Sequence, residues 1–205
     1  MRANKPYVVG LTGGTGTGKT EAAKYLESLG AARFDADEAS RAVTAPGGAA
    51  LPAIRAKFGD EVFYPDGTLN RRALGEIVFQ SMPHRRALEG IIHPLVQRDL
   101  LERMDAAAAA GTRVIILDVP LLFETGMDAL CDETWSLYAD REIQISRIIT
   151  RDGLTREQAE ARIDSMMSTQ ERNERATHTI NTDQTLEKTR QALQQLYRQA
   201  ERKAE

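Results

Sequence analysis

The chain has 205 residues, the length of one domain or of one domain with a small insertion. A hydrophobic content of 41% supports a buried core, while a net charge of −3 gives no basic surplus for nucleic-acid binding, and no apolar run approaches a membrane span. One cysteine, Cys131, excludes an intramolecular disulfide, and the N-terminus has no signal-peptide pattern, so we expect a cytoplasmic protein without nucleic-acid or membrane partners.

A glycine-rich loop follows the first predicted strand, residues 7–11, and precedes a helical pattern at 21–30. Residues 13–20 (GGTGTGKT) match the phosphate-loop pattern G-x-x-x-x-G-K-[ST] without a mismatch. Backbone N–H groups and the helix N-terminus cradle phosphates in such a loop, while Lys19 reaches the β- and γ-phosphates and the Thr20 hydroxyl holds Mg²⁺. We therefore expect ATP to be bound by Gly13, Gly14, Thr15, Gly16, Thr17, Gly18, Lys19, Thr20 and Glu21.

Two aspartates follow the second predicted strand, residues 32–34. Ligands collect at the carboxyl ends of strands in an open parallel sheet, where Asp35 and Asp37 would lie. One carboxylate can orient a substrate hydroxyl and take its proton, while the other contacts Mg²⁺ through water. The alternative is a polar turn that caps the helix beginning at Glu38.

The stretch from Ser40 to Gly111 contains no strong strand and predicts a helical insertion. Helices are expected at 49–58, at 71–80 with Asn70 as the N-cap, and from about Ser81 to Gly111. Pro94 would kink or restart the last of these helices. His93 just before it either binds a ligand or supports the kink.

The clearest strand, residues 113–118, ends in Asp118. A carboxylate at this position lies beside the phosphate loop and helps to hold Mg²⁺, directly or through water. The alternative is a turn or capping aspartate. Further strands are predicted at 134–139 and 177–181, and a closing helix at 186–202 is expected to turn four side chains inward, those of Leu186, Leu193, Leu196 and Tyr197.

The segment 141–175 is rich in arginine and contains no lysine. Helices are predicted at 143–150 and at 155–167, the second with a capping box of Thr155 and Gln158. Most of these arginines fit a salt-bridged helical face. Arg147 and Arg151, however, are one helical turn apart, and two guanidinium forks on one face suit the oxygens of a transferring phosphoryl group. We expect this segment to be a lid.

These elements predict an α/β fold of the P-loop NTPase class, with a five-stranded parallel sheet flanked by helices. A helical acceptor-binding insertion and an arginine-bearing helical lid complete it. We expect a single kinase domain and a monomer, with the core at 5–40, 111–140 and 176–205, the helical subdomain at about 41–110 and the lid at about 141–175.

Taken together, these segments resemble dephospho-CoA kinases almost from end to end. The matching motifs are GLTGGTGTGKT at 10–20, FDADEASR at 34–41, FGDEVFYPDGTLNRRAL at 58–74, IIHPLV at 91–96, LDVPLLFETG at 117–126 and RIITRDGLTREQAEARI at 147–163. The resemblance implies Mg²⁺-dependent transfer of the ATP γ-phosphate to the ribose 3′-hydroxyl of dephospho-CoA, the final step of CoA biosynthesis.

The resemblance also implies roles for individual residues. Asp37 looks like the base that faces the 3′-hydroxyl, acting with Lys19, Arg147 and Arg151 as the catalytic set. The acceptor pocket would comprise Asp35, Arg41, Asn70, Arg71, His93, Pro120, Leu121, Leu122 and Phe123. Thr20 and Asp118 would help to bind Mg²⁺.

Two segments depart from the family pattern. Residues 165–168 are Ser-Met-Met-Ser where the family usually has S-Q-M-P, and residues 176–182 are ATHTINT where A-D-x-V-I-D-N is common. These changes leave the lid hinge and the adenine contacts open. Another small-molecule P-loop kinase, acting on a nucleoside or nucleotide, is the alternative function. A GTPase-type switch fits less well, because Asp118 is not followed by the D-x-x-G pattern and N-K-x-D does not occur.

Overall fold

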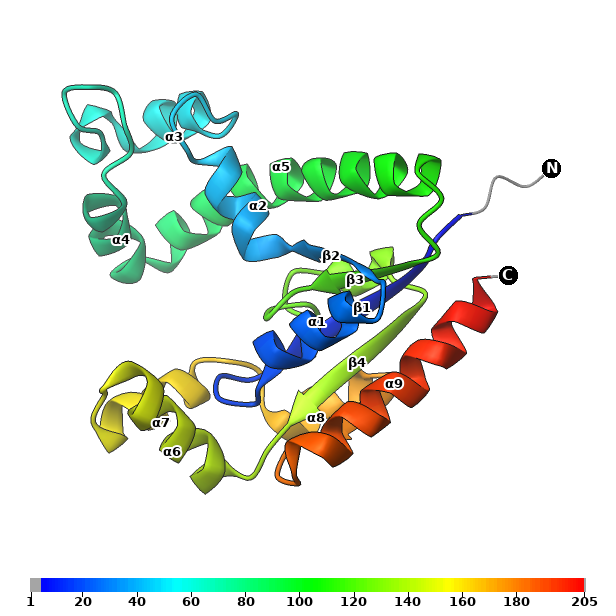
Figure 1. Ribbon diagram of the computed structural model, residues 1–205. Coiled ribbons are helices and arrows are strands. Elements are labelled where there is room, and N and C mark those ends of the chain that lie inside the picture. The colour runs from blue at the N-terminus through cyan, green and yellow to red at the C-terminus, as the bar shows by residue number, and fades with distance from the viewer. Residues whose placement is uncertain (1–4, 205) are drawn as a thin grey trace. The chain divides into compact units, whose positions relative to one another are not determined.

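A five-stranded sheet organises the chain, and the computed structural model describes residues 5–204 (Figure 1). The strand order is β2-β3-β1-β4-β5, and β1 pairs in parallel with β3 and β4, as β4 does with β5. The strands are β1 (Tyr7–Gly13), β2 (Ala32–Asp35), β3 (Val114–Asp118), β4 (Glu133–Tyr138) and β5 (His178–Asn181). The predicted P-loop NTPase fold with a five-stranded parallel sheet is confirmed.

Helices make up most of the remaining chain. The α-helices are α1 (Lys19–Ser28), α2 (Ala36–Val43), α3 (Leu51–Phe58), α4 (Arg71–Phe79), α5 (Met82–Ala109), α6 (Arg141–Asp152), α7 (Arg156–Asp164), α8 (Thr169–Arg175) and α9 (Leu186–Lys203). Two 3₁₀ turns, η1 (Asp60–Val62) and η2 (Met127–Leu130), complete the set. No helix within residues 5–204 is both long and apolar enough to cross a membrane.

The chain forms two compact units. One unit, the sheet unit, comprises the residues up to Phe34 and those from Met104 onward. The other, the helical unit, is Asp35–Arg103. The boundary therefore falls directly before the aspartate pair, whereas the sequence suggested a helical subdomain that starts at about residue 41.

The core of the sheet unit lies between the sheet and two helices. Val9 and Leu11 of β1 are fully buried, and α1 and α9 pack together over this face through residues such as Leu26 and Leu193 (Figure 1). Trp135 of β4 is fully buried here as well. Leu186 was predicted to face inward, and this is wrong: it is 58% exposed because it begins α9, beyond the cluster that the helix covers.

The alternate residues of β1 face other neighbours. A Cβ on Gly10 would lie 2.7 Å from Cys131 Sγ and 2.8 Å from the nearest Leu122 methyl group, so glycine lets these side chains approach the strand. Burial raises the pKa of the Cys131 thiol to about 12, and the nearby carboxylates of Asp128 and Asp132 add to the effect. The Cys131 thiol is therefore a poor nucleophile and serves to pack against the strand.

Two helical segments differ from the prediction. Helix α5 runs without interruption from Met82 to Ala109 with Pro94 inside it, so the helix does not restart there. The helix predicted at 155–167 is shorter than expected, because α7 ends at Asp164, and α8, which begins at Thr169, was not predicted. The capping box of Thr155 and Gln158 is present at the start of α7, and Asn70 caps α4.

Candidate active site

The phosphate loop is held in shape by its own side chains and by its glycines. Both the backbone N–H and the hydroxyl of Thr17 donate to Gly14 O, at 3.2 and 2.7 Å. Gly16 has φ 82°, and a Cβ there would lie only 2.8 Å from the backbone oxygen of Gln144 on α6. Gly18 is the N-cap of α1 with φ 79°. Only glycine meets these conditions without strain, and a loop of this curled shape can turn backbone N–H groups toward an anion.

Lys19, the second residue from the end of the loop pattern, pairs with Asp118 at the end of β3. The Asp118 side chain is 1% exposed, and Arg33 of β2 also donates to it, from Nε at 3.0 Å and from Nη2 at 2.7 Å. Both Arg33 donors reach Oδ2, while Lys19 binds Oδ1. The strand-end carboxylate that the sequence pointed to is therefore held by two cations in this structure.

Arg33 was not among the residues expected from the sequence. It belongs to β2, and the strand order places β2 next to β3 although about 80 residues separate them along the chain. An arginine in a short, half-buried strand carries no motif. Only its proximity to Asp118 could have identified Arg33, and that proximity can be inferred only when the strand order is known.

The two lid arginines have different partners. Arg147 donates from Nη1 to Gly16 O at 3.1 Å, and from Nη2 to Thr182 O at 2.7 Å. Arg151 instead forms a two-point ion pair with its neighbour Asp152, at 2.7 and 2.8 Å, which raises the pKa of Arg151 and lowers that of Asp152. Neighbouring acceptors of the protein therefore hold both guanidinium groups in this structure.

The remaining loop residues lie closer to solvent. Thr20 is exposed on the first turn of α1, and Glu21 pairs with Lys24 at 3.5 Å on the same helix. The Thr15 hydroxyl contacts the Met166 sulfur at 3.4 Å. Met166 belongs to the segment 165–168 that departs from the family pattern, so this segment touches the phosphate loop directly.

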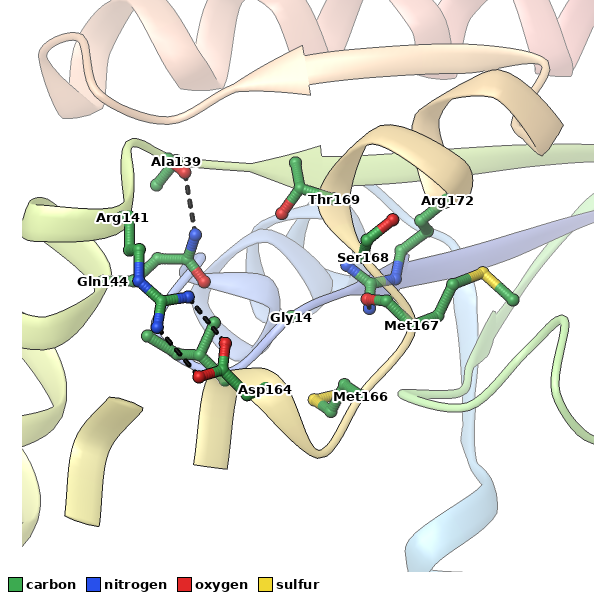
Figure 2. Close-up of a pocket in the computed structure, with 11 residues that line it drawn as sticks. Gly14, Ala139, Arg141, Gln144, Asp164, Met166, Met167, Ser168, Thr169 and Arg172 are labelled. Atoms are coloured by element: carbon green, nitrogen blue, oxygen red, sulfur yellow. Dashed lines mark hydrogen bonds and ion pairs between the residues drawn. The ribbon is translucent and has the colours of Figure 1, made fainter. Parts of the chain in front are cut away.

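A cavity of about 360 Å³ lies beside the loop (Figure 2). Gly14 of the loop and residues of the lid line it, among them Arg141, Gln144, Asp164, Met167 and Arg172. Figure 2 shows the ion pair between Arg141 and Asp164, at 2.7 and 3.0 Å, on one side and Arg172 with Met167 on the other. The cavity therefore joins the start of the phosphate loop to the lid.

Arg172 of α8 is a charged residue that is almost fully buried, with 1% exposed. Its Nη2 donates to Met167 O at 2.5 Å, while its buried Nε has no hydrogen-bond partner among the described residues. Burial lowers the pKa of the guanidinium, although the carboxylates of Glu124 and Glu171 act in the opposite direction. The sequence suggested an exposed salt-bridged face here, and for Arg172 that is wrong because α8 packs against β4.

Residues 120–123 continue from β3 across the end of β1. The Thr12 hydroxyl donates to Pro120 O at 3.0 Å. Leu122 and Phe123 are buried, while Leu121 is 38% exposed, so two of the four residues expected in an acceptor pocket belong to the core of the structure as described. The guanidinium of Arg175 lies over the Phe123 ring, 4.8 Å from its centre.

In the helical unit, the aspartate pair opens α2. Asp35 is the N-cap, and its Oδ1 accepts hydrogen bonds from the backbone N–H groups of Asp37 and Glu38 at 2.9 and 3.1 Å. Asp37 lies in the first helical turn with an exposed side chain. The capping alternative therefore describes Asp35, while the Asp37 carboxylate is directed to solvent.

The other predicted acceptor residues of this unit fall into two groups. Asn70 Oδ1 accepts the N–H of Ala73 at 3.1 Å as the cap of α4, and Arg71 Nη2 donates to Thr44 Oγ1 at 2.7 Å. Arg41 is exposed on α2, and its carbonyl oxygen lies 3.5 Å from Arg71 Nη2. His93 is half-buried on α5. Arg71 thus links α4 to the end of α2 and brings two of these arginines close together.

Comparison with known proteins agrees with this geometry. The family model for dephospho-CoA kinase matches residues 7–188. A dephospho-CoA kinase of Symbiobacterium thermophilum is 40% identical over 193 residues, covering 94% of this chain and 81% of the relative. One of Geobacillus kaustophilus is 39% identical, with 93% and 95% covered. A crystal structure from Thermus thermophilus has a TM-score of 0.82 at 31% identity, covering 95% of this chain and 97% of that one. The chain therefore belongs to the dephospho-CoA kinase family.

Proposed function

We propose that this chain transfers the γ-phosphate of ATP to the ribose 3′-hydroxyl of dephospho-CoA, forming CoA and ADP. The family match over residues 7–188 carries the assignment, because it spans both the phosphate loop and the helical unit. The loop alone supports only nucleotide binding, since the same pattern serves many NTPases. The acceptor is therefore assigned by family, and the donor by family and geometry together.

On the donor side, the N–H groups of the loop and the N-terminus of α1 would bind phosphate oxygens. Lys19 would move from Asp118 to the β- and γ-phosphates. Arg147 would keep the loop in shape through Gly16 and Thr182. Arg151 is 59% exposed in its side chain, and we assign it to the transferring phosphoryl group, for which it would exchange Asp152 as its partner.

On the acceptor side, Asp37 would take the proton of the ribose 3′-hydroxyl. The hydroxyl oxygen then bonds to the γ-phosphorus as the bond between that phosphorus and the bridging oxygen breaks, and ADP leaves. Asp35 fixes the first turn of α2 and so supports the position of Asp37. Arg41, Asn70, Arg71 and His93 of the helical unit would contact the acceptor.

Mg²⁺ fits the residues beside the loop. The Thr20 hydroxyl and the Asp118 carboxylate offer oxygen ligands, and Mg²⁺ in such sites is usually bound by one or two carboxylates, substrate phosphates and water. When bound, the ion neutralises charge on the phosphates. Arg33 holds Oδ2 of Asp118, so we assign Thr20 to direct contact with the ion and Asp118 to contact through water, by way of Oδ1 once Lys19 has moved to the phosphates.

A coupled ADP-release assay tests the function. ATP and Mg²⁺ are supplied with dephospho-CoA, AMP, adenosine or pantetheine as the acceptor. We expect kcat/KM to be highest for dephospho-CoA, with ADP released only when an acceptor is present. A clear preference for AMP or adenosine would contradict the proposal and favour a nucleotide or nucleoside kinase.

A further inference from the structure

In the ion cluster formed by Lys19, Arg33 and Asp118, two cations contact the same carboxylate. The Asp118 side chain is 1% exposed, and those of Lys19 and Arg33 are 15% and 19% exposed, so the cluster is largely shielded from water. Asp118 therefore accepts from two cations in a setting largely shielded from water. Lys19 is on the phosphate loop and Arg33 is on a strand of the sheet.

The two cations differ in how readily each can leave. Arg33 presents two N–H groups, Nε and Nη2, to the same oxygen at 3.0 and 2.7 Å, and its planar fork fixes the geometry. Lys19 offers a single ammonium group on a flexible four-carbon stem. An incoming triphosphate would therefore draw away Lys19 and leave Arg33 in place.

Removing every partner from a buried carboxylate leaves an uncompensated charge, which is strongly unfavourable. If Lys19 were the only partner of Asp118, the transfer of Lys19 to ATP would leave the buried carboxylate uncompensated. Arg33 removes the penalty because it stays on Oδ2 when Oδ1 loses its partner. It also divides the attraction of Asp118 between two cations, and this weakens the hold on Lys19.

We propose that Arg33 is a positioning residue that neutralises Asp118 and so releases Lys19 to the ATP phosphates. Arg33 acts through Asp118 and Lys19 and does not itself touch the nucleotide. The inference rests on the proposed function only in that ATP binds at the loop. It adds a residue that the phosphate-loop motif does not contain.

The test is a double-mutant cycle on ATP affinity, measured by isothermal titration calorimetry with wild-type protein, Arg33→Met, Asp118→Asn and the double variant. We expect Arg33→Met to weaken ATP binding about tenfold or more, since Asp118 then retains Lys19. Asp118→Asn in the Arg33→Met background should restore affinity to within a few-fold of wild type, because the amide no longer holds Lys19. Arg33→Lys should lose less than Arg33→Met.

Two controls keep the outcomes distinct. Arg198→Met, an exposed arginine of α9, should bind ATP as wild type does, and thermal unfolding of each variant identifies any that fails to fold. Unchanged ATP affinity in folded Arg33→Met and Arg33→Lys would overturn the proposal, as would a double variant that binds more weakly than Arg33→Met. Failure of the wild-type protein to bind ATP would instead contradict the proposed function itself.

Discussion

Lys19 meets both the buried Asp118 and, in the proposed complex, the phosphates of ATP. Lys19→Ala removes the cation that compensates the β- and γ-phosphates, so we expect ATP affinity to fall about tenfold or more and turnover to fall further. Calorimetry with ATP and a turnover assay measure the two effects. Lys188→Ala, on the exposed surface of α9, is the matched control. Full ATP affinity and full rate in the Lys19 variant would show that the loop does not bind phosphate as described.

Replacing Asp37 should affect turnover but not ATP affinity, unlike replacing Lys19. Asp37→Asn keeps the size of the side chain and removes the base, so kcat should fall about 10²–10⁴-fold while ATP affinity stays near that of wild type. Single-turnover phosphoryl transfer, together with ATP titration, measures both quantities. Glu38→Gln, the next exposed carboxylate on the same turn, serves as the control. Turnover that survives in the Asp37 variant would remove this residue from the role of base.

Single residues can be predicted from the sequence where a motif marks them. They cannot be predicted where only contacts with distant residues give them a role. The phosphate-loop pattern identifies Lys19 by its spacing alone. Arg33 and Arg172 could not be found this way, because their importance comes from neighbours distant in sequence, Asp118 and the cavity beside Gly14. A charged side chain is expected at the surface by default, so a buried arginine is visible only in three dimensions.

At the scale of single elements, the N-cap of α4 allows a structural role to be separated from a binding role. Asn70 Oδ1 accepts the N–H of Ala73, and serine can do the same. Asn70→Ala should lower the free energy of unfolding by about 1 kcal/mol, while Asn70→Ser should largely preserve it. Urea denaturation measures this difference.

The same pair of variants tests whether the Asn70 amide contacts the acceptor. If the Asn70 amide contacts the acceptor, Asn70→Ser raises KM for dephospho-CoA although the helix remains capped. If KM rises only in the less stable Asn70→Ala variant, Asn70 is a cap and not a binding residue. KM for ATP should stay constant in both variants.

Helices and strands were predictable according to the strength of their pattern. The buried strands β1 and β3 are continuous apolar runs, typical of parallel sheets, and were located to within two residues of their ends. Helix α8 was missed because its seven residues, TQERNER, contain no apolar side chain to mark a buried face. Helix α5 continues through Pro94 because tertiary packing can override a local breaker.

At the scale of the whole sheet unit, Glu133 joins four elements through one buried carboxylate. It accepts hydrogen bonds from Tyr7 of β1 at 3.1 Å, from Trp135 of its own strand at 2.9 Å and from Lys203 of α9 at 2.6 Å. His178 of β5 lies 3.8 Å away. Burial alone would raise the pKa of Glu133, but the hydrogen bonds, led by that of Lys203, outweigh it and lower the pKa.

The lowered pKa sets the direction of a pH effect. The stabilisation by Glu133 is fully present above its ordinary pKa of about 4.5 and is lost as the pH falls through the lower value of the folded state. Glu133→Gln should reduce the free energy of unfolding at pH 7 by about 2 kcal/mol, and the difference from wild type should shrink below pH 4.5. Chemical denaturation from pH 3 to 7, with the exposed Glu27→Gln as control, measures it. A difference independent of pH would contradict this role.

The fold class and the strand, glycine loop and helix at its start could be predicted from the sequence, because these elements are local in the chain. The division before Asp35 differs from the start expected at about residue 41, and the central place of β1 was not predicted, because both depend on contacts between distant segments. The monomeric state remains a prediction, which sedimentation velocity can check.

The most direct test of the central claim is to determine where the phosphate goes. The protein is incubated with ATP, Mg²⁺ and dephospho-CoA, and the product is analysed by ³¹P NMR and mass spectrometry. The account predicts one new phosphomonoester on the ribose 3′-oxygen, formed in a one-to-one ratio with ADP and lost when Asp37 is replaced by Asn. A phosphate at another position, or ADP formed without a phosphorylated acceptor, would contradict it.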